Sequence, residues 1–140
     1  MARVVIEPAI AVKWFVPEVH SGPAARLLDG GHELLASDAL MTEAARIVSS
    51  KTRLGELTHN EGVQILEAIG SVPVSLQPSQ PLLAAALHIA TVLDLSLGDV
   101  LGLTVAIHSD CRLVTARQTL YDRLQSTPFA VHVKWVGDIR

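Results

Sequence analysis

The sequence has few of the groups that cross-link a protein or give it a strong charge. Its 140 residues contain one cysteine, Cys111, so no internal disulfide bond can form, and a reducing cytoplasm is the simplest location. Charged residues make up only 18% of the chain and the formal net charge is -3, so no overall positive charge attracts nucleic acid. The longest uncharged helical run, residues 100–109, is far shorter than the ~20 residues of a membrane span, so we expect no membrane association.

Several motifs of catalysis and cofactor binding are also missing. The chain has no second cysteine and no closely spaced histidines, so no pattern indicates a zinc site. No glycine-rich loop follows a strand as in phosphate-binding loops, and no serine stands in a nucleophile elbow. Apolar residues, in contrast, make up 49% of the chain, which at this length is enough to bury one core. We therefore expect a single domain over residues 1–140.

Short apolar runs that are typical of strands alternate along the chain with helical periodicity. The predicted strands cover residues 3–6, 33–36, 73–76, 112–115 and 131–136. The predicted helices cover residues 9–15, 21–29, 38–54, 58–69, 80–94, 97–109 and 118–125. This alternation predicts a three-layer α/β/α sandwich with a mainly parallel central sheet. In such sheets, binding sites lie outside the carboxyl ends of the strands.

Three isolated carboxylates interrupt segments that are otherwise apolar. Glu7 follows the first strand, Glu43 lies within a helix, and Asp99 is the only charge in residues 96–108. Ionised carboxylates avoid apolar surroundings unless they are paired or bound to a cation. Three of them on separate segments suggest one shared site for a hard divalent ion, Mg²⁺ or Mn²⁺.

Each of these carboxylates also has a simpler explanation. The stem of Glu43 could be buried while its carboxylate reaches water. Asp99 could belong to the cap of a helix that begins after Ser96, and Glu7 could be the polar end of a strand. For Asp38, a role as a helix cap is the preferred interpretation.

Four segments occur in a characteristic order along the chain: VVIEPAIAVKWFVPE, LLASDALMTEAARIV, LSLGDVLGLTVA and RLVTARQTLYDRL, with WVGDI near the end. Together they resemble the PIN-domain family, and in particular the VapC-like toxin ribonucleases of bacterial toxin–antitoxin pairs. The acids of the first three segments would be Glu7, Glu43 and Asp99. Two positions depart from the family: its first Asp is Glu7 here, and Arg117 stands where its fourth acid is expected.

The resemblance implies an endoribonuclease that depends on Mg²⁺ or Mn²⁺ and acts as the toxin of a type II toxin–antitoxin pair. Glu7, Glu43 and Asp99 would hold the metal and, with Thr115, form the catalytic set, in which Thr115 would orient a water or a metal ligand. Arg117 would contact a phosphate of the RNA substrate. The expected partners are a cognate antitoxin protein, RNA and a second copy of the chain in a homodimer.

The two departures support an alternative function. Arg117 could pair with Glu7 or Asp99 and leave no metal site, because a guanidinium binds carboxylates in bidentate fashion. The chain would then be a catalytically impaired PIN-like domain that binds an antitoxin, RNA or itself. Basic side chains on one helix, Arg46 and Arg53 among them, could form a rim for nucleic acid, although a solvated helix face is the simpler explanation.

Overall fold

The strands lie side by side in one parallel sheet, in the order β3-β2-β1-β4-β5, in a computed structural model that describes residues 2–140. Their bounds are β1 (Ala2–Ile6), β2 (His32–Ser37), β3 (Ser75–Gln77), β4 (Arg112–Thr115) and β5 (Val133–Trp135). The chain moves from β1 through β2 to β3 on one side, whereas β4 and β5 lie on the other side. The strand order therefore reverses between β1 and β4, and such reversals open a crevice at the carboxyl ends of the strands.

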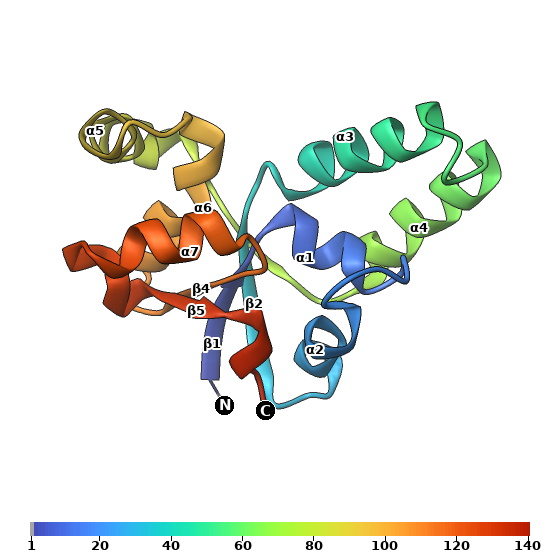
Figure 1. The fold of residues 1–140 in the computed structure, drawn as a ribbon, viewed down its shortest axis with the longest axis horizontal. Coiled ribbons are helices and arrows are strands. Elements are labelled where there is room, and N and C mark those ends of the chain that lie inside the picture. The colour runs from blue at the N-terminus through green and yellow to red at the C-terminus, as the bar shows by residue number, and fades with distance from the viewer. Residues whose placement is uncertain (1) are drawn as a thin grey trace.

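Helices cover both faces of this sheet. They are α1 (Pro8–Lys13), α2 (Ser21–Ala25), α3 (Leu40–Arg53), α4 (His59–Ser71), α5 (Leu83–Leu93), α6 (Leu97–His108) and α7 (Gln118–Gln125). Figure 1 shows α1 to α4 on one side and α5 to α7 on the other. Within residues 2–140, no single helix is long and apolar enough to cross a membrane; residues 80–93 and 97–108 reach that threshold only as a pair bent by 118°.

The alternation of side chains along β1 explains why both faces are covered. Val4 and Ile6 belong to the core cluster under α1, α3 and α4, whereas Val5, between them, belongs to the cluster under α5, α6 and α7. Successive strand residues point to opposite faces, so a strand with consecutive buried apolar residues, as at positions 4–6 of β1, needs a helical layer on each side. The predicted three-layer α/β/α sandwich with a parallel sheet is confirmed.

Each predicted strand and helix is present, with differences at the ends. The last strand begins only at Val133, because residues 128–132 form a 3-10 helix after Pro128. The interpretation of Asp38 as a helix cap is wrong: its carboxylate accepts the N–H of Ser79 at 3.2 Å, and the start of α3 has no side-chain cap. Asp38 therefore holds the segment after β3 rather than the helix that follows it in sequence.

The capping box predicted at the start of α4 is confirmed and can be tested. The Thr58 hydroxyl accepts the Glu61 N–H at 3.1 Å, and the Glu61 carboxylate accepts the Thr58 N–H at 2.8 Å. Thr58→Ala removes one acceptor and should lower the free energy of unfolding by about 1 kcal/mol. Urea denaturation followed by circular dichroism measures this loss.

Thr91→Ala is the matched control for that measurement. The Thr91 hydroxyl donates to the Leu87 carbonyl on the exposed side of α5, and this hydroxyl caps no helix terminus. Alanine has the higher helix propensity, so we expect a change within about 0.5 kcal/mol. An equal loss in both variants would contradict the role of the cap.

Candidate functional site

Three segments meet at the carboxyl edge of the sheet, beside the point where the strand order reverses. Glu7 directly follows β1, and Arg117 lies two residues after the end of β4, the neighbouring strand. Asp99 lies in the first turn of α6, where Ser96 is the N-cap and its hydroxyl accepts the Asp99 N–H. Positions far apart in the sequence are therefore brought together by strand pairing and by the start of one helix.

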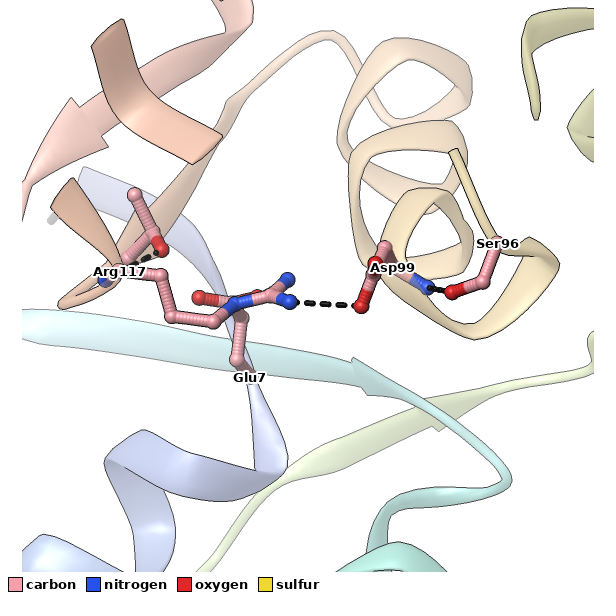
Figure 2. A network of polar contacts seen from close by, with 5 residues as sticks. Glu7, Ser96, Asp99 and Arg117 are labelled. Carbon is pink, nitrogen blue, oxygen red and sulfur yellow. Dashed lines mark hydrogen bonds and ion pairs between the residues drawn. The ribbon is translucent and has the colours of Figure 1, made fainter. Parts of the chain in front are cut away.

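The guanidinium of Arg117 joins two of the predicted acids. Its Nη2 lies 2.5 Å from Glu7 Oε2 and its Nη1 lies 2.6 Å from Asp99 Oδ1, so it stands between the two carboxylates (Figure 2). The backbone of Arg117 is also fixed, because its N–H donates to the Thr115 hydroxyl at 3.1 Å. Hydrogen bonds between ionised partners are shorter and stronger than neutral ones, so these contacts hold the guanidinium against both carboxylates.

Burial affects the protonation of the three groups in different ways. Glu7 is only 7% exposed, and burial raises the pKa of its carboxyl group although the charge of Arg117 and the Thr115 hydroxyl oppose this effect. Partial burial also disfavours ionisation of Asp99, but hydrogen bonds from Arg117 and Ser96 outweigh it and lower the pKa. Burial acts against the charge of Arg117, yet the two carboxylates raise the pKa of the guanidinium, which stays positive. The guanidinium of Arg117 is thus the group of the site that keeps its charge.

Glu43 faces the same space from α3. It helps to line a hollow of ≈ 290 Å³ that we call the acid pocket, whose lining includes Glu7, Glu43, Arg46, Gly98, Asp99 and Arg117. The carboxylate of Glu43 pairs with Arg46 at 3.0 Å rather than with Arg117. The structure therefore brings the three predicted acids to one pocket, but each of them is engaged by an arginine.

In this arrangement the pocket does not fit the predicted divalent ion. Across residues 2–140, no group of three or more acidic, histidine or cysteine side chains is arranged to hold a metal. Arg117 takes one oxygen from Glu7 and one from Asp99, and the remaining Glu7 Oε1 is buried without a hydrogen-bond partner. Mg²⁺ takes several carboxylate oxygens together, and here the guanidinium of Arg117 stands where the ion would have to join Glu7 and Asp99. The metal role of Glu7, Glu43 and Asp99 stays a prediction that requires Arg117 to move.

The structure brings two further residues to the site, Arg46, which the sequence offered only as part of a basic helix face, and Gly98. Arg46 lines the acid pocket, and so does Gly98 in the first turn of α6. The signal for Arg46 was available, because it lies three residues after Glu43 and such pairs are neighbours on a helix surface. Gly98 gave no comparable signal, since only the packing of α6 against the strand ends brings its backbone to the pocket.

Comparison with protein families identifies the chain. The model of the PIN domain matches residues 4–123, which is most of the sequence. The chain belongs to the PIN-domain family. PIN domains are generally nucleases, and PIN nucleases typically use a divalent metal. The family predicted from the sequence motifs is therefore confirmed, and this PIN domain differs from that general picture in the arginine at its centre.

Solved structures with the same fold support this assignment. PAE2754 from Pyrobaculum aerophilum superposes with a TM-score of 0.71 at 17% identity, over 97% of this chain and 85% of that chain. VapBC2 from Rickettsia felis, solved with a DNA fragment from their promoter, gives 0.68 at 14% identity, over 95% of this chain and 98% of that chain. Identities this low establish the fold alone. No curated protein sequence matches the chain significantly.

The ion pair predicts a stability effect that depends on pH. Arg117→Gln leaves the Glu7 carboxyl group buried without its counter-charge, and we expect the free energy of unfolding to fall by about 2 kcal/mol at about pH 8. The pKa of Glu7 is already raised, so its protonation favours the folded state; the loss should shrink toward about pH 5 and grow as pH rises. Urea denaturation at both pH values measures the difference.

Arg46→Gln is the control for this experiment. Its side chain is 73% exposed and its pairing with Glu43 is a surface contact, so the loss should stay below about 1 kcal/mol at both pH values. A loss for Arg117→Gln that is the same at both pH values would contradict the link to Glu7.

Proposed function

We propose that this PIN domain is the toxin-type member of a toxin–antitoxin pair, and that its acid pocket binds RNA instead of cleaving it with a metal. The observation that carries the proposal is the guanidinium of Arg117, bonded to Glu7 at 2.5 Å and to Asp99 at 2.6 Å. The four sequence motifs and the fold shared with VapBC2 support membership of the toxin–antitoxin class. This is the catalytically impaired alternative that the sequence left open.

Electrostatics favours this function over metal-dependent cleavage. The guanidinium supplies a fixed positive charge that stabilises two neighbouring carboxylates, which would otherwise repel each other. A divalent ion that entered the pocket would meet this charge and would have to displace two charge-assisted hydrogen bonds. The Arg117 side chain is 37% exposed, which leaves part of it accessible to a phosphate of RNA.

A second candidate function is the endoribonuclease that depends on Mg²⁺ or Mn²⁺. It is favoured by one observation: Glu7, Glu43 and Asp99 all line the acid pocket, although they come from separate segments. This activity requires Arg117 to turn away from the two carboxylates. Thr115, the predicted fourth member of the set, is fully buried and its hydroxyl accepts the Arg117 N–H, so this function also requires the hydroxyl to become accessible.

Manganese binding separates the two functions. The wild-type protein should show no binding of Mn²⁺ in calorimetric titration up to about millimolar concentration, because Arg117 neutralises the acids. Arg117→Asp replaces the competing charge by a fourth carboxylate, and we expect a measurable binding heat and a rise in melting temperature with Mn²⁺.

Asp99→Asn is the control in both backgrounds. It should abolish the binding that Arg117→Asp creates and should change nothing in the wild-type titration. Wild-type binding that Asp99→Asn removes, together with cleavage of single-stranded RNA, would favour the ribonuclease over our proposal.

We also propose a homodimer that forms through α5. This helix exposes Leu83 and Leu87, which lie four residues apart on one face, and Leu87 is 62% exposed. Residues 83–93 contain no charged side chain. An uncharged apolar face is complementary to a second copy of itself across a two-fold axis. The antitoxin is then proposed to bind elsewhere on each subunit.

Light scattering after size-exclusion chromatography tests the dimer. Leu87→Glu places a charge in the middle of the proposed interface and should give a monomeric mass, because an unpaired buried charge is costly. Val131→Glu is the matched control, since Val131 is 66% exposed but lies outside α5. Equal masses for both variants would contradict this interface.

A further inference from the structure

We infer that Arg46 and Arg117 together form a binding site for a phosphodiester group, and that the three acids serve to orient these two arginines. The inference rests on the proposed RNA binding and names the contacts that provide it. Its starting point is the pairing within the acid pocket: Glu43 holds Arg46 at 3.0 Å, while Glu7 and Asp99 hold Arg117.

Both arginines keep hydrogen-bond donors that the acids do not use. Arg117 gives one bond through Nη1 and one through Nη2, which leaves further N–H groups on a side chain that is 37% exposed. Arg46 gives one bond through Nη2 and is 73% exposed. Both residues line one hollow of ≈ 290 Å³, so in our inference one phosphate contacts both guanidinium groups. Guanidinium donors match phosphate oxygens in geometry and charge.

The first turn of α6 adds a third contact to this pocket. Gly98 lines the hollow and is exposed, and apart from its own helix and chain neighbours nothing lies within 4 Å of the position that a Cβ would occupy. The first N–H groups of a helix lack partners within the helix and favour negative charge. This contribution is secondary, because the negative charge of Asp99 in the same turn repels an anion.

The balance of charge in the pocket defines the class of ligand. Three acids and two arginines face the hollow, so its positive charge is confined to the guanidinium groups. A singly charged phosphodiester suits such a pocket better than inorganic phosphate, whose second charge the carboxylates would repel. The site should therefore recognise the backbone of a single strand and discriminate against free phosphate.

Arg46→Gln, with Arg53→Gln as its control, tests the site. Arg53 lies two turns further along α3, is exposed, and lines a different hollow between α3 and α4, so both variants lose the same charge from one helix. Fluorescence anisotropy with a labelled single-stranded uridine oligonucleotide, measured over a series of KCl concentrations, gives the affinity and its salt dependence.

For Arg46→Gln we expect about tenfold weaker binding, the effect of one lost charge-assisted hydrogen bond, and a salt slope lower by about 0.7. Arg53→Gln should bind within about twofold of wild type. Inorganic phosphate at about millimolar concentration should not displace the oligonucleotide. Equal losses in the two variants, or displacement by phosphate, would overturn the inference.

Glu43→Gln tests whether Glu43 serves to orient Arg46 or to bind a metal ion. Glutamine keeps an acceptor for Arg46 and removes a negative charge, so the affinity for the oligonucleotide should equal or exceed that of wild type. A tenfold loss would mean that the charge of Glu43 is needed, and would count against the inference.

The outcomes distinguish this inference from the proposed function. Wild-type protein that binds no RNA would contradict both. RNA binding that is insensitive to Arg46→Gln would contradict the phosphodiester site alone. Equal binding of a deoxythymidine oligonucleotide would support the phosphodiester site and contradict the choice of RNA.

Discussion

The ion pair of Arg117 with Glu7 and Asp99 is the interaction on which the rest of the site depends. It connects the end of β1, the loop after β4 and the first turn of α6, which are separate in sequence. Glu7 is almost fully buried, and an ionised carboxylate in that position needs a partner. Arg117 is that partner, so the same contact stabilises the edge of the sheet and determines the charge of the pocket.

Glu7 and Arg117, which stand where the family motif leads us to expect an aspartate and a fourth acid, contact each other. A glutamate is one methylene longer than an aspartate, and at position 7 it reaches a guanidinium that projects from the neighbouring strand end. This PIN domain keeps the parallel sheet of its fold, and the guanidinium of Arg117 supplies a positive charge between two of its acids. In the function that we propose, its acids orient arginine side chains and the pocket binds an anion.

Most of the fold could be predicted because its signals are local. The alternation of apolar runs and helical periodicity gave each strand and helix, and the capping box at Thr58 and Glu61 has the predicted hydrogen bonds. Asp38 shows where local signals end. A carboxylate before a helix is a common cap, but the carboxylate of Asp38 accepts the N–H of Ser79, which lies 41 residues away and outside the local pattern.

The sequence by itself predicted the family, the parallel sandwich and the three candidate acids, Glu7, Glu43 and Asp99. Motif order along the chain and local periodicity can be read without knowing the tertiary contacts. Both possible roles of Arg117, phosphate contact and pairing with Glu7 or Asp99, were also present in the sequence. Only the tertiary structure decided that the guanidinium bonds both carboxylates at once and that Arg46 lines the same pocket. The physical reason is that ion pairing depends on distances of a few ångströms, which the packing of β1, β4, α3 and α6 establishes.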